Sequence, residues 1–131
     1  MKLLLINIIF LVLVRLTTYS DISGIPEGIP NAFKNGDARA LAAYFNNYIE
    51  LVILDNEDVY NKSQAESLIK DFFKKNPTKD FEIIHQGGKK TSQYAIGHLK
   101  TKTGGFRVYI LMKVENTKYV IHQMRIEKYE E

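Results

Sequence analysis

The chain has 131 residues, the length of one domain, and a formal net charge of +3. It contains no cysteine, which excludes disulfides, thiolate catalysis and zinc sites built from cysteine. Lys2 and Arg15 belong to an N-terminal segment that we expect to be removed, and without them 16 basic residues face 15 acidic ones. Such a nearly neutral domain lacks the charge of a nucleic-acid-binding protein, so we expect no nucleic-acid partner.

The first 20 residues have the pattern of a cleavable signal peptide. An apolar run from Leu3 to Val14 follows a positively charged start, and it is shorter than the about 20 apolar residues that span a bilayer. Small residues at Thr18 and Ser20 suit a signal peptidase. We therefore predict a signal peptide over 1–20, a domain over 21–131, export to the periplasm or the medium, and no stable membrane insertion after cleavage. An uncleaved membrane anchor is the alternative.

The domain begins with helical patterns. Ile29–Asn35 is predicted to form a short helix that Gly36 ends, and Asp37 is predicted to cap a second helix over Ala38–Asn46. A strand rich in β-forming residues follows at Tyr48–Leu54.

A turn is expected at Asp55–Asp58 because of its composition. Ser63 and Glu66 match a capping box at the start of a third helix, which Pro77 ends. Four strands joined by short turns complete the chain, so neighbouring strands are antiparallel. This order predicts an α+β fold with helices on one face of a curved antiparallel sheet. The predicted strands are Phe81–Gln86, Gln93–Thr101, Gly105–Val114 and Tyr119–Lys128, and Gly87-Gly88 is the first of their links.

Residues of a strand alternate between the two faces of the sheet. The third of these strands has one wholly apolar face, which we expect to meet the helices: Phe106, Val108, Ile110, Met112 and Val114. In the last strand, the same alternation points Val120, His122, Met124 and Ile126 inward and Tyr119, Ile121, Gln123, Arg125 and Glu127 outward.

The outward residues combine aromatic, aliphatic and arginine side chains, which is typical of protein interfaces. We predict a homodimer that forms through this face, and an ordinary solvated face is the alternative. The predicted interface residues are Arg107, Tyr109, Leu111, Tyr119, Ile121, Gln123 and Arg125.

All three histidines of the chain are placed on the inner side by the same alternation, with the bulkier residues of their strands. Three imidazoles can bind a metal or move protons, but they are far apart in sequence and show no ligand spacing. We therefore assign no catalytic residue, no metal ligand and no cofactor, and we predict instead that these side chains line a ligand pocket. The candidates are Tyr60, His85, Tyr94, His98 and His122.

Motifs along nearly the whole domain resemble a bacterial exported family described as domain of unknown function 4783. Gly28 and Pro30 depart from its plainer first helix. The order of elements also resembles the nuclear-transport-factor-2-like cone, which implies a fold related to cystatin-like proteins, a pocket and a dimer. The motifs include Gly36-Asp37, Leu41-Ala42, Tyr44-Phe45, Ile53-Leu54-Asp55, Val59-Tyr60-Asn61-Lys62, Lys70-Asp71-Phe72-Phe73, His85-Gln86-Gly87, Phe106-Arg107-Val108-Tyr109 and Ile121-His122-Gln123.

Such a fold implies no particular activity, because it carries enzymes, ligand binders and interaction modules. We favour a non-enzymatic module of the cell envelope that binds a small apolar ligand or another protein. One alternative is a small isomerase, dehydratase or hydrolase that uses the inner histidines as acids and bases. The other alternative is a purely structural dimer with a filled core.

Overall fold

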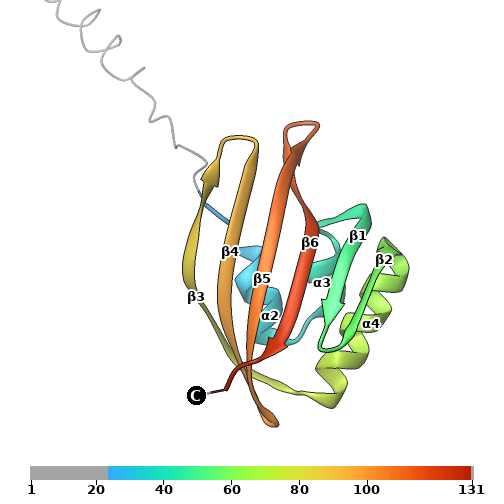
Figure 1. Cartoon of the computed structure of the whole chain (residues 1–131), viewed down its shortest axis with the longest axis vertical. Coiled ribbons are helices and arrows are strands. Elements are labelled where there is room, and N and C mark those ends of the chain that lie inside the picture. Colours follow the sequence, from blue (N-terminus) through green and yellow to red (C-terminus); the bar gives the residue numbers. More distant parts are fainter. Residues whose placement is uncertain (1–23, 131) are drawn as a thin grey trace, which may run out of the picture.

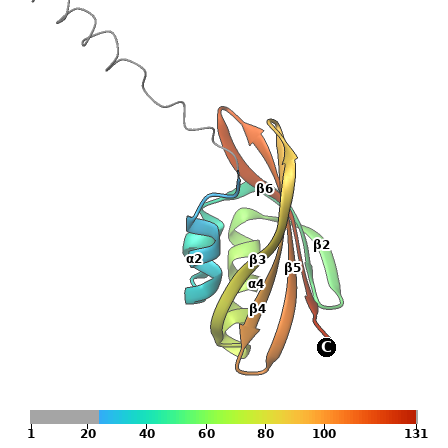
Figure 2. The same ribbon diagram turned by 90° about the vertical axis from the view of Figure 1, so that its left-hand side faces the viewer.

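The computed structural model describes residues 24–130, so the predicted signal peptide lies outside the described part. Three helices cover one face of a curved six-stranded sheet, as Figures 1 and 2 show. The strand order is β2-β1-β6-β5-β4-β3. Neighbouring strands are antiparallel except β1 and β6, which are parallel. The predicted α+β fold is confirmed. Its elements are α2 (Gly28–Asn35), α3 (Ala38–Ala42), β1 (Phe45–Ile53), β2 (Asn56–Asn61), α4 (Lys62–Lys75), β3 (Thr78–Lys89), β4 (Ser92–Thr101), β5 (Gly104–Glu115) and β6 (Lys118–Lys128).

The two short helices lie where the sequence predicts, except that α2 begins one residue earlier, at Gly28, and α3 ends earlier. Gly36 has a left-handed backbone (φ 62°) and ends α2, and the Asp37 carboxylate accepts a hydrogen bond of 3.0 Å from the Ala40 amide. However, α3 ends at Ala42 instead of Asn46, because Phe45 already begins β1 and pairs with β6. No helix within residues 24–130 is long and apolar enough to cross a membrane.

The segment between β1 and α4 differs from the prediction. The expected turn at Asp55–Asp58 is largely the short strand β2, which pairs with β1. The capping box uses Asn61 and Gln64 instead of Ser63 and Glu66: the Asn61 side chain accepts from the Gln64 amide (2.8 Å), and the Gln64 side chain accepts from the Asn61 amide (3.2 Å). The helix starts earlier than predicted because asparagine is also a strong N-cap residue.

Hairpin turns join β1 to β2, β3 to β4, β4 to β5 and β5 to β6. Asn116 and Thr117 both have positive φ (48° and 68°), as a type I′ turn between twisted strands requires. The predicted turn at Gly87-Gly88 is wrong, since both glycines lie within β3 and pair with β4. Gly88 has a φ of 134°, and a Cβ there would lie 2.2 Å from the Ser92 carbonyl oxygen, so only glycine fits this position.

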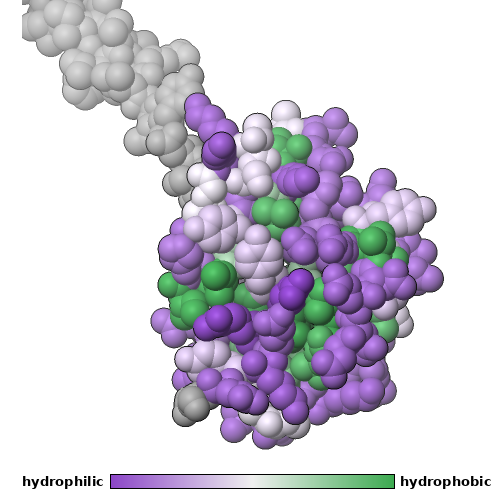
Figure 3. All heavy atoms as spheres, viewed as in Figure 1, coloured by the Kyte–Doolittle hydropathy of each residue, from purple (hydrophilic) through white to green (hydrophobic). Residues whose placement is uncertain are grey.

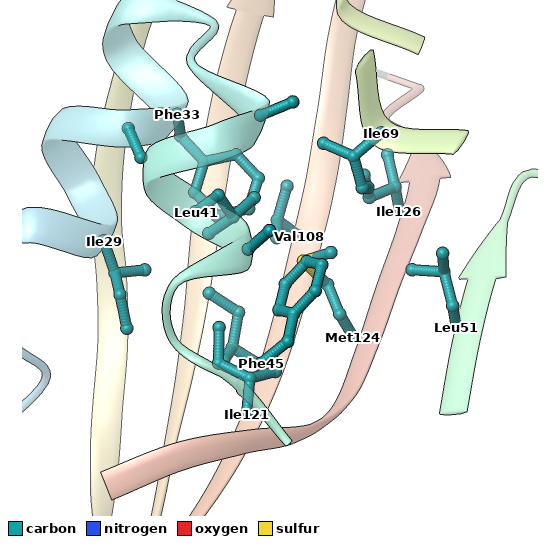
Figure 4. Packing of buried hydrophobic residues seen from close by; sticks show 14 of the residues in the cluster. Ile29, Phe33, Leu41, Phe45, Leu51, Ile69, Val108, Ile121, Met124 and Ile126 are labelled. Atoms are coloured by element: carbon teal, nitrogen blue, oxygen red, sulfur yellow. The ribbon is translucent and has the colours of Figure 1, made fainter. Parts of the chain in front are cut away.

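The helices and the inner sheet face share one apolar core (Figure 4). Phe33 of α2, Leu41 of α3 and Ile69 of α4 are fully buried against the strands. The predicted inner face of β5 is confirmed from Phe106 to Met112, while Val114 at its end is exposed. Side chains therefore fill the space between the helices and the middle of the sheet.

Candidate functional site: the outer face of the sheet

The structure places β4 the opposite way round from the prediction. Ala95, Gly97 and Leu99 face the helices and are buried. Tyr94 and His98 point outward, because their partners in register on β5 are residues of its outer set. The small residues face inward since the helix side is tightly packed: a Cβ on Gly97 would lie 2.2 Å from the Phe81 ring.

A β-bulge turns His85 outward. Phe81 and Ile83 point inward, but the register shifts so that Ile84 has no partner and His85 pairs with Ile96. One extra residue reverses the alternation beyond it. His85 therefore points outward, and the prediction that it faces the inner side is wrong.

A second bulge explains the errors in β6. Leu111 pairs with Gln123, whereas Met112 pairs with Ile121, so His122 is the extra residue. Beyond the bulge the faces are reversed: Ile121 is fully buried, and the predictions that it points outward and contributes to the outer interface are wrong.

The same shift affects the neighbours of this bulge. Val120 pairs with the outward Lys113, and Tyr119 pairs with Val114 of the inner set, so both predicted orientations are wrong. The Tyr119 hydroxyl donates a hydrogen bond of 2.9 Å to the Lys90 carbonyl. Tyr119 therefore joins two hairpin tips and does not contribute to the outer face.

The five pocket candidates do not meet in one place. His122 Nε2 is buried and lies 3.1 Å from the Glu115 carboxylate, at ion-pair distance but without hydrogen-bond geometry. Tyr60 pairs with Ile49 at the other end of the sheet and packs against the core. Within residues 24–130 no group of three histidine, aspartate or glutamate side chains is arranged to hold a metal ion.

The outward side chains form a surface that we call the outer face, in three cross-strand rows. Its central row runs from His85 through Ile96 and Tyr109 to Arg125. On one side of it lie Tyr94, Leu111 and Gln123, and on the other lie His98, Arg107 and Glu127. Figure 3 shows this face with apolar patches between polar groups.

Polar contacts order the side chains of the outer face. His85 Nε2 and the Tyr94 hydroxyl lie 2.9 Å apart in a hydrogen bond. Arg125 forms an ion pair of 3.0 Å with Glu127. At the end of the sheet, the Arg107 guanidinium lies over the Tyr129 ring at 5.6 Å from its centroid. Such ordering lowers the entropy that the side chains lose when a partner covers them.

The His85–Tyr94 pair lies on an open face and not in an enclosed pocket. His85 and Tyr94 are within hydrogen-bond reach of each other, but His85 is solvent-exposed on an open face, where water competes for every polar group. A hollow of about 470 Å³ beside the α2–α3 junction is lined by Gly36, Arg39, Glu66 and other residues. It contains none of the five pocket candidates.

Ile96 and Tyr129 also belong to the outer face, which was not predicted from the sequence. The signal for Ile96 was present in β4, where large and small residues alternate. Tyr129 follows the last strand, where alternation no longer applies, so only its contacts with His98 and Arg107 reveal its place.

Comparison with known proteins identifies relatives of this chain. The model of the family described as domain of unknown function (DUF4783) matches residues 26–127. The crystal structure of a DUF4783 protein from Bacteroides ovatus is 36% identical, with a TM-score of 0.79, over 82% of this chain and 97% of the other. One from Bacteroides fragilis is 33% identical, with a TM-score of 0.77, over 81% and 100%.

A more distant structure has the same fold. A domain of unknown function with a cystatin-like fold from Nostoc punctiforme is 8% identical, with a TM-score of 0.65, over 79% of this chain and 72% of the other. No curated protein matches this chain.

Proposed function

The chain belongs to the DUF4783 family, and from this starting point we propose that it is a non-enzymatic protein-interaction module that binds a second copy of itself through the outer face. The observation that supports the proposal is the half-buried row of Ile96 and Tyr109 beside Tyr94 and Leu111. Apolar and aromatic side chains surrounded by arginine are characteristic of interface centres.

The outer face is large enough for a stable dimer. The four strands β3 to β6 have 10 to 12 residues each. With a strand spacing of about 4.8 Å and a rise of about 3.3 Å per residue, the backbone of these strands covers a projected area on the order of 600 Å². Side chains enlarge that area, which brings it close to the about 800 Å² that each partner buries in a standard interface.

The charges of the face suit self-association. In a two-fold interface each patch meets its own copy, so a face with charges of one sign repels itself. Here Arg107 and Arg125 are accompanied by Glu127 and Glu50 of the adjoining strands. A rotated copy can therefore bring each arginine near a carboxylate while the apolar rows cover one another.

Binding rather than acid–base catalysis is supported by exposure. The His85–Tyr94 hydrogen bond lies on an open face, and side chains fill the core on the opposite side of the sheet. Electrostatic interactions are strong where water is excluded. On this open face, water is excluded only when a partner covers it.

The test is the oligomeric state of the wild type and of Leu111→Asp, measured by sedimentation equilibrium. We expect the wild type to have the mass of two chains and L111D the mass of one, because a partner would bury an unpaired carboxylate. The control is Leu68→Asp, an exposed leucine on α4, which should remain dimeric. A wild type with the mass of one chain at every concentration would refute the proposal.

We also propose that residues 1–20 direct export to the periplasm or the medium. The support is the pattern of the sequence alone: a charged start is followed by an apolar run that is too short to span a bilayer. Intact mass measurement of the protein from a producing bacterium tests this. A mature chain that begins near Asp21 is expected, and a cytoplasmic chain that retains Met1 or Lys2 would contradict it.

A further inference from the structure

A hollow of about 340 Å³ lies at the end of the sheet, where β4 turns into β5. Lys79 and Lys100 line it together with His98 and Tyr129, and Gly104 and Gly105 form part of its wall. None of these residues was assigned to the apolar centre of the outer face. We call this site the basic hollow.

Glycine keeps the wall of the basic hollow bare. Gly104 has a φ of 138°, and a Cβ added there would meet no atom within 4 Å, so its surroundings are open. A Cβ on Gly105 would lie 2.9 Å from His98 Nε2, so the absence of a side chain lets the imidazole lie against the backbone. A small group can therefore approach the backbone closely at Gly104, whereas the His98 imidazole covers Gly105.

The lysines of the basic hollow are not neutralised. Lysine and arginine form three ion pairs with carboxylates within residues 24–130, and neither Lys79 nor Lys100 takes part in them. Two carboxylates on the strands near the hollow already have ion-pair partners: Asp80 pairs with Lys34 at 3.8 Å, and Glu127 pairs with Arg125 at 3.0 Å.

Glu82, opposite His98 in register, is the remaining acidic side chain of these strand rows. Arg107, opposite His98 on the other side, adds a further positive charge. Glu130, next to Tyr129, is a second carboxylate without an ion-pair partner in the described part of the chain. The two lysines and this arginine still outnumber these two unpaired carboxylates, so the local field favours an anion.

The aromatic side of the hollow is held in place. The Tyr129 ring lies 4.7 Å from the His98 ring, centroid to centroid, and Arg107 lies over Tyr129. Within the described part of the chain, His98 Nε2 is buried and has no hydrogen-bond partner. A buried polar atom without a partner costs free energy.

We propose that the basic hollow binds a compact oxyanion, namely the carboxylate or phosphate group of a small organic molecule. The two lysines supply the charge, the bare glycine backbone gives room for the anion, and Tyr129 borders the remainder of the ligand. The lysines and glycines of this site lie outside the three rows of the outer face, although His98 belongs to one of those rows. Anion binding and self-association are therefore tested by different variants.

The test is an NMR titration of the ¹⁵N-labelled protein with inorganic phosphate and, separately, with citrate, at constant ionic strength. Glycine amides resonate apart from most others, so Gly104 and Gly105 report directly on the hollow. We expect saturable shifts at both glycines, with at least tenfold weaker binding in the double variant K79Q/K100Q. The matched control K74Q/K75Q, at the end of α4, should bind as the wild type does.

The two probes separate the two chemistries. Saturation by phosphate alone assigns the site to phosphate groups, and saturation by citrate alone assigns it to carboxylates. Chemical-shift changes that rise linearly with the concentration of both anions would mean an adventitious ion only and would overturn the proposal. Changes as large at the Lys89 and Lys90 amides as at the two glycines would mean the same. Unchanged affinity in a well-dispersed K79Q/K100Q spectrum would overturn it too.

Discussion

Gly97→Ala should destabilise the fold far more than a single methyl group usually does. The new Cβ would lie 2.2 Å from Phe81 Cζ, whereas ordinary contact begins at 3.4 Å, so the ring must move by about 1.2 Å. Phe81 stacks on Phe33 with 4.6 Å between ring centroids. The displacement therefore disturbs the contact that holds α2 against the sheet.

The expected cost follows from overpacking. Extra methyl groups in a packed core cost about 1–3 kcal/mol, and loss of a stacked aromatic pair adds about 0.5–1.5 kcal/mol. We expect a loss of about 3 kcal/mol and, at about 4–8 °C per kcal/mol for a domain near 100 residues, a fall in melting temperature of at least about 10 °C.

Calorimetry or thermal unfolding by circular dichroism measures this change. The control is the double variant G97A/F81L, in which the smaller side chain leaves room for the new methyl group. It should cost clearly less than the two single changes added together. A melting temperature of G97A within about 2 °C of the wild type, given that scale, would show that the Phe81 contact is not as described.

Three further predictions concern local contacts. Asn61→Ala should lower the free energy of unfolding in urea by about 1 kcal/mol, whereas Ser63→Ala should change it by less than about 0.5 kcal/mol. A larger loss for Ser63→Ala would mean that Ser63, as predicted from sequence, caps the helix. Phe33→Ala should cost about 3–5 kcal/mol by the same measurement, and a cost below about 1 kcal/mol is incompatible with its full burial. Tyr94→Phe removes the hydrogen bond to His85 on an open face, so its melting temperature should change little; a large fall would mean that this bond is structurally essential.

The sequence predicted most elements because their signals are local. Gly36 and Asp37 end one helix and begin the next, and strand alternation identified the apolar face of β5. The short strand β2 was missed because its residues, Asn56–Asn61, have turn-like composition. Its pairing with β1 is a tertiary contact that overrides local preference.

The candidate site was harder to predict because facing depends on register. A single unpaired residue, Ile84 in β3 or His122 in β6, reverses the faces on the far side of it. Nothing in the local sequence marks either bulge. The three histidines were therefore predicted to share an inner face, whereas His85 and His98 lie on the outer one.

The association of two outer faces is tested most directly by a distance between protomers. The chain lacks cysteine, so a single spin label can be placed at Lys113→Cys, exposed on the outward side of β5, or at Leu68→Cys on α4. Since paired sheets lie about 10 Å apart, double electron–electron resonance should find a shorter distance between protomers for the label at 113 than for the label at 68. A shorter distance at 68, or no coupling between protomers at either position, would contradict association through the outer face.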